Sequence, residues 1–261
     1  MTSWVAISRT DHLNKRWRPS QGFNFAAEQQ IVPVLIAEIA KVAPHFVTGF
    51  VPAEDGAFQY IALVGVGGER NFYVNSDSLW LCDYIPANLR AYPFAVLNDP
   101  EGNKVFCIDE SHLTDDDSFP RLFKDNGELE QLPGETVNFI GQCEESRLHT
   151  IKACAVLNDM ELIEPWAIEI PRNEGQGPLA INGVYKINEE KLNALDAEQL
   201  LTLRNMSALP LAYAQLFSMA QMDQLIKRVN YHSANDPKKA PAELDGLFGE
   251  GDGGTLNFDS L

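Results

Sequence analysis

Apolar and polar positions follow regular spacings along most of the first 230 residues. Between residues 26 and 42 the apolar positions recur every three or four residues, which predicts an amphipathic helix on Ile31, Val34, Leu35, Ile39 and Val42. Pro33 lies inside this run, and proline is tolerated best in a first turn, so we expect the helix to begin there. Two short strands are predicted next, at 46–50 and 58–66, and the second is apolar enough to be central.

The stretch 60–97 predicts a hairpin-like strand pair, a turn that carries a tryptophan, a one-turn helix opened by Pro86, and a further strand. Glycines 65, 67 and 68 in this stretch resemble a phosphate loop. A nucleotide site needs a helix after its glycines, whereas here a strand is expected, so a turn or bulge is favoured. Aromatic residues are denser here than a strand pair needs for packing, which indicates a surface that encloses or grips something.

Strands and helices continue to alternate after residue 97. We expect a turn at 99–103, a strand at 104–109, a long helix at 135–157 that covers one face of a sheet, a strand at 160–170 interrupted by Pro165, a loop around 175–178 and a strand at 179–187. The aspartates 115–117 are compatible with a metal ligand set or with a solvated face, and the solvated face is favoured.

From 188 to 230 nearly every segment has helical character. Helices are predicted at 189–195, after an N-cap at Asp196, and at 210–229. The whole pattern predicts an α+β protein in which a mostly antiparallel sheet is covered by helices, with a helical C-terminal third, and with residues 1–230 forming one domain.

Residues 231–261 lose this periodicity and are rich in glycine, aspartate and proline, which predicts a flexible acidic tail. Apolar residues recur near its end, as they do in a linear peptide that docks into a groove: Leu247, Phe248, Leu256, Phe258 and Leu261. Two docking modes stay open, one onto the tail's own domain and one onto another protein.

Charge, cysteine spacing and the length of apolar runs disfavour several classes of function. The formal charge of −17 disfavours nucleic acid as a partner, because affinity for phosphate depends on clustered lysine and arginine. The four cysteines never approach the spacing of a zinc or redox motif, no apolar run is long enough to span a membrane, and no secretory leader is visible. We therefore expect a cytoplasmic protein that does not insert into membranes.

Catalytic and metal-binding motifs do not emerge from the sequence. The five histidines form no metal-ligand pattern, and there is no nucleophile elbow, so we expect neither a cofactor nor a catalytic residue. Arg90 lies between Tyr84 and Tyr92, where a guanidinium could stack on aromatic rings and hold a carboxylate. The alternative is a structural arginine that packs against Trp80. The candidate binding residues are Trp80, Tyr84, Arg90, Tyr92 and Phe94.

Several segments resemble the SapC family. The matching segments are Trp4 with His12, FNFAAEQQIVPVLIAEI, residues 44–50, NFYVNSDSLWLCDYIPANLRAYPF at 71–94, LFKDNGE at 122–128, GVYKINEEKLNAL at 183–195 and ALPLAYAQLFSMAQMDQL at 208–225. One departure is visible, because the family pattern leads us to expect a glycine after Asp77, where this chain has Ser78.

The resemblance implies a bacterial accessory protein and brings no active site with it. Members of this family resemble proteins that are encoded beside flavin-dependent halogenase-like enzymes, iron and 2-oxoglutarate oxygenase-like enzymes, and TonB-dependent receptors. We therefore expect a non-catalytic accessory protein that binds a peptide or protein partner, such as one of these enzymes or a receptor segment. The alternatives are an enzyme that modifies peptide side chains with a bound metal or cofactor, and a component of surface-layer protein export, which rests on the family name.

Overall fold

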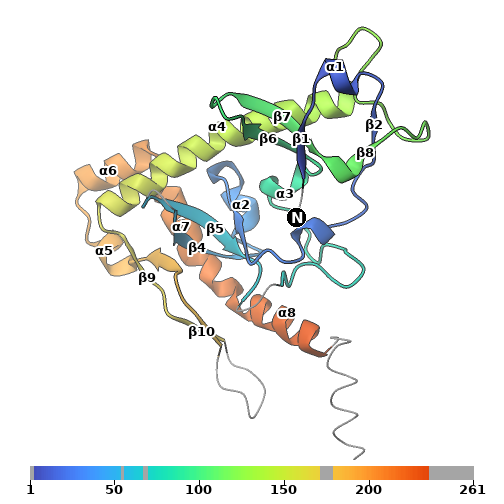
Figure 1. The fold of residues 1–261 in the computed structure, drawn as a ribbon. Coiled ribbons are helices and arrows are strands. Elements are labelled where there is room, and N and C mark those ends of the chain that lie inside the picture. Colours follow the sequence, from blue (N-terminus) through green and yellow to red (C-terminus); the bar gives the residue numbers. More distant parts are fainter. Residues whose placement is uncertain (1–2, 54–55, 67–69, 171–178, 235–261) are drawn as a thin grey trace, which may run out of the picture.

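The computed structural model describes residues 3–53, 56–66, 70–170 and 179–234, and it confirms the α+β class with antiparallel sheets and a helical C-terminal stretch (Figure 1). The five-stranded sheet has the order β3-β5-β4-β12-β9, and a three-stranded sheet has the order β1-β7-β6. Strands β2 and β8 form a small pair, as do β10 and β11. The tail predicted from residue 231 is wrong at its start, because residues 231–234 end the last helix, and residues 235–261, including all five apolar docking residues, lie outside the described residues.

The strands are short. Their bounds are β1 (Trp4–Ala6), β2 (Arg16–Trp17), β3 (Ile31–Pro33), β4 (Val47–Pro52), β5 (Phe58–Leu63), β6 (Phe94–Asn98), β7 (Lys104–Asp109), β8 (Leu113–Thr114), β9 (Ile163–Pro165), β10 (Ile168–Ile170), β11 (Leu179–Ile181) and β12 (Tyr185–Ile187). The α-helices are α1 (Arg9–His12), α2 (Ile39–Val42), α3 (Ala87–Arg90), α4 (Gln131–Asp159), α5 (Glu189–Asn193), α6 (Ala197–Asn205), α7 (Ala208–Ser218) and α8 (Met222–Ala234). Single 3-10 turns lie at Asn24–Ala26, Ile36–Glu38, Glu110–His112 and Met219–Gln221.

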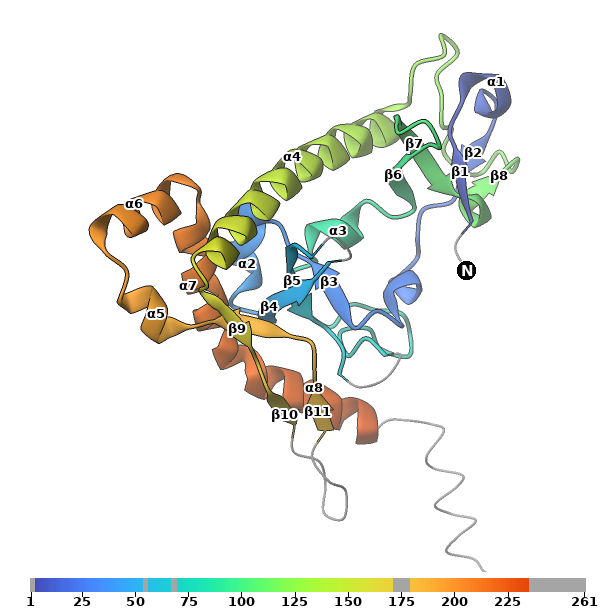
Figure 2. The same cartoon turned by 60° about the vertical axis from the view of Figure 1, so that its left-hand side comes forward.

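Helix α4 connects the two larger sheets. Its 29 residues correspond to about 43 Å at the usual rise per residue, and it runs from the three-stranded sheet to the far end of the five-stranded one (Figures 1 and 2). It packs on β5 at one end, close to α6 and α7, and on β6 at the other. The expected helix at 135–157 is confirmed and is longer at both ends.

The helix predicted within residues 26–42 is confirmed only in its last part, residues 36–42, and its expected start at Pro33 is wrong. Residues Ile31–Pro33 form strand β3, which pairs antiparallel with β5, and helical structure begins only at Ile36. The strand lies at the sheet edge, where a proline without an N–H is tolerated. Val32 and Val34 are both buried and two residues apart, so the segment follows strand periodicity, which the flanking apolar residues obscured.

The hairpin expected within 60–97 is also wrong, because the hairpin partner of β5 is β4, which precedes it. Between 70 and 86 the described backbone is irregular and has a single bridge, Val74 to Trp80. Glycines 67 and 68 lie outside the described residues, as does the loop at 175–178. The one-turn helix after Pro86 and the strand after it are confirmed as α3 and β6.

Other departures are smaller. The strand expected at 179–187 is split at Gly183 into β11 and β12, and the helix expected at 210–229 is two helices, α7 and α8, joined by a 3-10 turn. Asp196 is the N-cap of α6, as predicted, and Gln199 completes its capping box. Of the aspartates at 115–117, Asp115 pairs with Lys15 and Asp117 pairs with Arg16, both near the N-terminus.

Gln215 of α7 joins β4 to β12 inside the core. The two strands align at Tyr185 and Phe50, and continuing that register would place Ile187 opposite Thr48. There the Gln215 amide lies between them: its oxygen accepts from the Ile187 N–H at 2.9 Å, and its NH₂ donates to the Thr48 carbonyl at 3.2 Å. The side chain thus supplies the two bonds that neighbouring backbones would otherwise exchange.

Replacing Gln215 with leucine should therefore destabilise the protein by about 2–4 kcal/mol, because two buried backbone groups lose their partners. Chemical denaturation measures the free energy of unfolding. Gln224→Leu on the exposed face of α8 is the matched control and should change it by less than about 0.5 kcal/mol. Equal effects of the two substitutions would show that the amide bridge contributes nothing.

Candidate functional site

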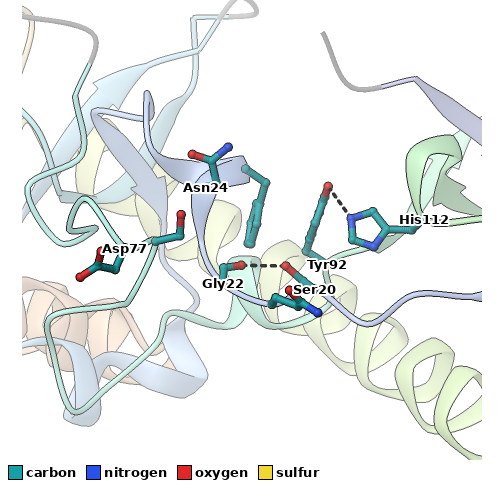
Figure 3. A pocket seen from close by; sticks show the side chains of 9 residues that line it. Ser20, Gly22, Asn24, Asp77, Tyr92 and His112 are labelled. Atoms are coloured by element: carbon teal, nitrogen blue, oxygen red, sulfur yellow. Dashed lines mark hydrogen bonds between the residues drawn. The ribbon is translucent and has the colours of Figure 1, made fainter. Parts of the chain in front are cut away.

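The strongest candidate site is an open recess of about 490 Å³ in front of Tyr92, here called the Tyr92 recess. It is lined by Ser20, Gln21, Gly22, Asn24, Phe25, Asp77, Ser78, Tyr92 and His112. Figure 3 shows the Tyr92 ring and the His112 imidazole pointing toward each other beside the loop that carries Ser20 and Gly22. The volume falls within the usual range for small-ligand pockets.

One aromatic stack forms part of the lining of the recess. Phe25 lies parallel to Tyr92, with ring centroids 3.9 Å apart and an interplanar angle of 10°. On another side the His112 ring meets Tyr92 edge-on, at 5.1 Å and 88°. Tyr92 is thus held between two rings while one side of it still lines the recess.

A hydrogen-bonded chain leads from the recess to a buried carboxylate. The Tyr92 hydroxyl donates to Asp109 at 2.6 Å, and Nε2 of His112 lies 3.1 Å from the same hydroxyl oxygen. Nδ1 of His112 lies 2.6 Å from the Arg18 carbonyl, so Nδ1 carries a proton and donates it there. When Nε2 is also protonated it donates to Tyr92, and the resulting imidazolium is joined through one phenol to the Asp109 carboxylate.

The pKa values of the groups in this hydrogen-bonded chain are set by burial and hydrogen bonding. Burial, followed by the hydrogen bond to Asp109, raises the pKa of Tyr92, which therefore stays a donor. Burial by itself raises the pKa of Asp109, but the bonds donated by Tyr92 and Ser111 outweigh it and leave that pKa below its usual range. Asp109 therefore remains a carboxylate at neutral pH.

A second buried carboxylate, Glu38, holds the segment that leads to Tyr92. Its Oε2 accepts from the Tyr84 hydroxyl at 2.7 Å and from the Ala87 N–H at 2.8 Å, while Oε1 accepts from the Leu35 N–H at 3.0 Å. Glu38 is 5% exposed. Its three hydrogen bonds join the turn before α2 to the start of α3. Burial, together with the hydrogen bond to Glu38, raises the pKa of Tyr84.

Trp80 is partly buried and packs against the main core, and it does not line the recess. Its Nε1 donates to the Tyr84 carbonyl at 2.8 Å, and its ring packs against Phe23, Phe46 and Tyr73. These contacts stabilise the irregular segment between β5 and α3.

Arg90 and Phe94 complete the predicted set. The Arg90 guanidinium lies over the rings of Tyr84 and Phe139, at 5.7 and 4.9 Å from their centroids, and it is exposed. Phe94 is buried in a small second core with Trp17, Ile108, Leu122 and Phe123, and it also lines a second groove. The five predicted residues therefore do not surround one recess, because Tyr92 lines one cavity and Phe94 lines another. Trp80 and Arg90 both contact Tyr84 and line neither the Tyr92 recess nor the second groove.

A comparison with family models matched residues 7–225 to the model described as SapC. The chain belongs to the SapC family. Comparisons with curated proteins and with solved structures gave no match. In this SapC family member, Ser78 has a φ of 61°, a left-handed conformation that glycine adopts more easily, and this agrees with the glycine expected after Asp77.

Two further findings bear on the function of this SapC chain. Within the residues that the structure describes, no group of three or more histidine, cysteine, aspartate or glutamate side chains is placed to hold a metal ion. Over the same residues, no helix combines the length and the apolar character that a membrane span requires.

Several residues that shape the site were not predicted from the sequence. Glu38, Phe25, Asp109 and His112 were not singled out for the recess, although FNFAAEQQIVPVLIAEI, one of the SapC-like segments, contains Phe25 and Glu38. A glutamate in an otherwise apolar run was an available signal for a buried carboxylate, since such a group needs donors around it.

Replacing Tyr84 with phenylalanine should lower the free energy of unfolding by about 1.5–3 kcal/mol, the usual value of a hydrogen bond to a charged group. Tyr213→Phe on the exposed face of α7 removes a hydroxyl with no hydrogen-bond partner among the described residues, and it should change stability by less than about 0.5 kcal/mol. Denaturant titration of both variants checks the difference.

Asp109 should make stability depend on pH in the acid range. Because folding lowers its pKa, its stabilisation is fully present above the unfolded-state value of 3.8 and is lost as pH falls through the folded value. The stability gap between the natural chain and Asp109→Asn should therefore be largest near neutral pH and shrink below about pH 4. A gap that stays constant from pH 7 to pH 2.5 would contradict the ionised state of Asp109.

Proposed function

We propose that this SapC family member is a non-catalytic accessory protein that binds a peptide, or a peptide segment of a partner protein, in the Tyr92 recess. The observation that carries the proposal is an open cavity whose lining combines a pre-formed aromatic stack, several polar side chains and an imidazole. The stacked rings of Phe25 and Tyr92 supply apolar area to the lining, while Asn24 adds an exposed amide with no side-chain partner among the described residues. Most of the lining residues are polar, which suits a peptide backbone and polar side chains, and the aromatic rings add the apolar contact.

Groups of both signs lie at the recess, because Asp77 lines it beside the imidazole of His112, so a segment with polar or mixed charges fits it best. When His112 is protonated, the imidazolium is anchored by the Arg18 carbonyl and by Tyr92, so its position is fixed before a ligand arrives. The expected partners are halogenase-like or oxygenase-like enzymes, or a segment of a TonB-dependent receptor. These partners come from the family resemblance, and the recess supplies a place where such a segment would bind.

An enzyme that modifies peptide side chains is the second candidate. The hydrogen bonds that connect His112, Tyr92 and Asp109 have the form of a proton relay. It lies at the edge of a cavity, where an imidazole could exchange a proton with a bound group. The relay serves binding equally well, because it fixes the orientation of both rings.

Affinity capture separates binding at the recess from binding elsewhere. Asn24→Trp fills the recess from an exposed position and should leave folding unchanged, while His112→Ala removes the imidazole. A partner identified by mass spectrometry should be retained by the natural chain and by Lys152→Ala on α4, and should be reduced about tenfold or more by either recess variant, a loss of about 1.4 kcal/mol. Equal capture by all four proteins, with thermal midpoints within a few degrees of one another, would overturn the proposal.

The captured partner then tests the enzyme alternative. Incubation of the purified protein with that partner should leave the partner's intact mass unchanged, and metal analysis with an absorption spectrum should show no stoichiometric metal or chromophore. A mass change that disappears in Tyr92→Phe would replace the accessory role with catalysis.

A further inference from the structure

A second cavity, here called the β6–α4 groove, follows one edge of the three-stranded sheet. Its volume is about 930 Å³. All five residues of β6, Phe94–Asn98, line it, although successive side chains of a strand point to opposite faces. Lys104 and Phe106 of β7 line it as well, so the cavity reaches from the sheet face beneath α4, where Lys104 pairs with Glu144 at 2.9 Å, to the outer edge of β6, the last strand of its sheet.

The register shows which backbone groups face this edge. The Asp109 N–H donates to the Pro93 carbonyl, so Pro93, Ala95 and Leu97 direct their backbone groups toward β7. Val96 and Asn98 therefore direct theirs to the outer edge, and within the described ranges no other strand pairs with them. An unpaired edge of this kind is a template for one more strand.

The opposite wall of the groove is one face of α4. Val137, Ile140, Gly141, Glu144 and Leu148 recur along it at helical spacing. Gly141 leaves space, because a Cβ at this position would meet no heavy atom within 4 Å. Leu97 and Leu148 are 39% and 46% exposed, so apolar surface lies uncovered on both walls.

We propose that residues 255–259 of this same chain add to β6 as an extra antiparallel or parallel strand. The segment reads Thr-Leu-Asn-Phe-Asp, so Leu256 and Phe258 are two residues apart and share one face of an extended chain. That face enters the groove, while Thr255, Asn257 and Asp259 face the solvent. This inference concerns a different surface from the Tyr92 recess and does not rest on the proposed function.

The length of the chain permits this arrangement within one molecule. The described residues end at Ala234, and the 20 residues 235–254 reach up to about 65 Å when extended. A compact domain of this size has a radius of gyration of about 17 Å, so the extended segment is longer than the diameter of such a domain.

Hydrogen exchange on the full-length chain tests the proposal. The Val96 and Asn98 amides should be protected in the natural chain and should exchange about tenfold faster or more in the double variant L256D/F258D. The matched control, T255D/N257D, adds the same charge on the other face of the segment and should keep the protection. A second variant blocks the groove itself: Gly141→Leu should also expose the two amides, whereas Gln142→Leu next to it should not.

Three results would overturn the proposal. One is the absence of protection at Val96 and Asn98 in the natural chain, and another is equal protection in L256D/F258D and the natural chain. The third is protection that grows with protein concentration together with a dimeric mass by light scattering, which would assign the groove to the segment of a second copy.

Discussion

The buried carboxylate of Glu38 is the interaction on which the functional region depends. It accepts three hydrogen bonds from two parts of the chain that lie almost 50 residues apart in sequence. Nearby, the Ile36 N–H donates to Thr150 of α4, so the same turn is attached to the long helix. A buried charge is costly without such partners, and this requirement specifies where α3 begins.

The position of α3 in turn sets the positions of Tyr92 and Phe94. These two residues come directly after the helix, two residues apart, and they serve different surfaces. Tyr92 contacts Phe25 and His112 at the recess, and Phe94 is the first residue of the edge strand that forms one wall of the β6–α4 groove. Strand β6 is therefore an element shared by both surfaces, and a displacement of α3 would disturb the two together.

Patterns with long or strongly marked periodicity were predictable from sequence. Helix α4, the separate strands β4 and β5, the one-turn helix after Pro86 and the Asp196 cap all depend on residues close together in the chain. The strand β3 was not predictable, because its apolar residues also fit a helix and only pairing with β5 decides between them. The aromatic cluster of 71–94 was predictable as a region, but which ring faces a cavity depends on Glu38, Phe25 and His112, which come from other segments.

Local hydrogen exchange in Glu38→Gln tests the role of this carboxylate most directly. Glutamine places an NH₂ donor against the Leu35 or Ala87 N–H, so one of the three bonds must break. The amides of Ala87–Arg90 should then exchange about tenfold faster or more, while those of Val47–Phe50 in the main sheet stay unchanged. Unchanged exchange in α3, or an equal acceleration throughout the protein, would contradict the role assigned to Glu38.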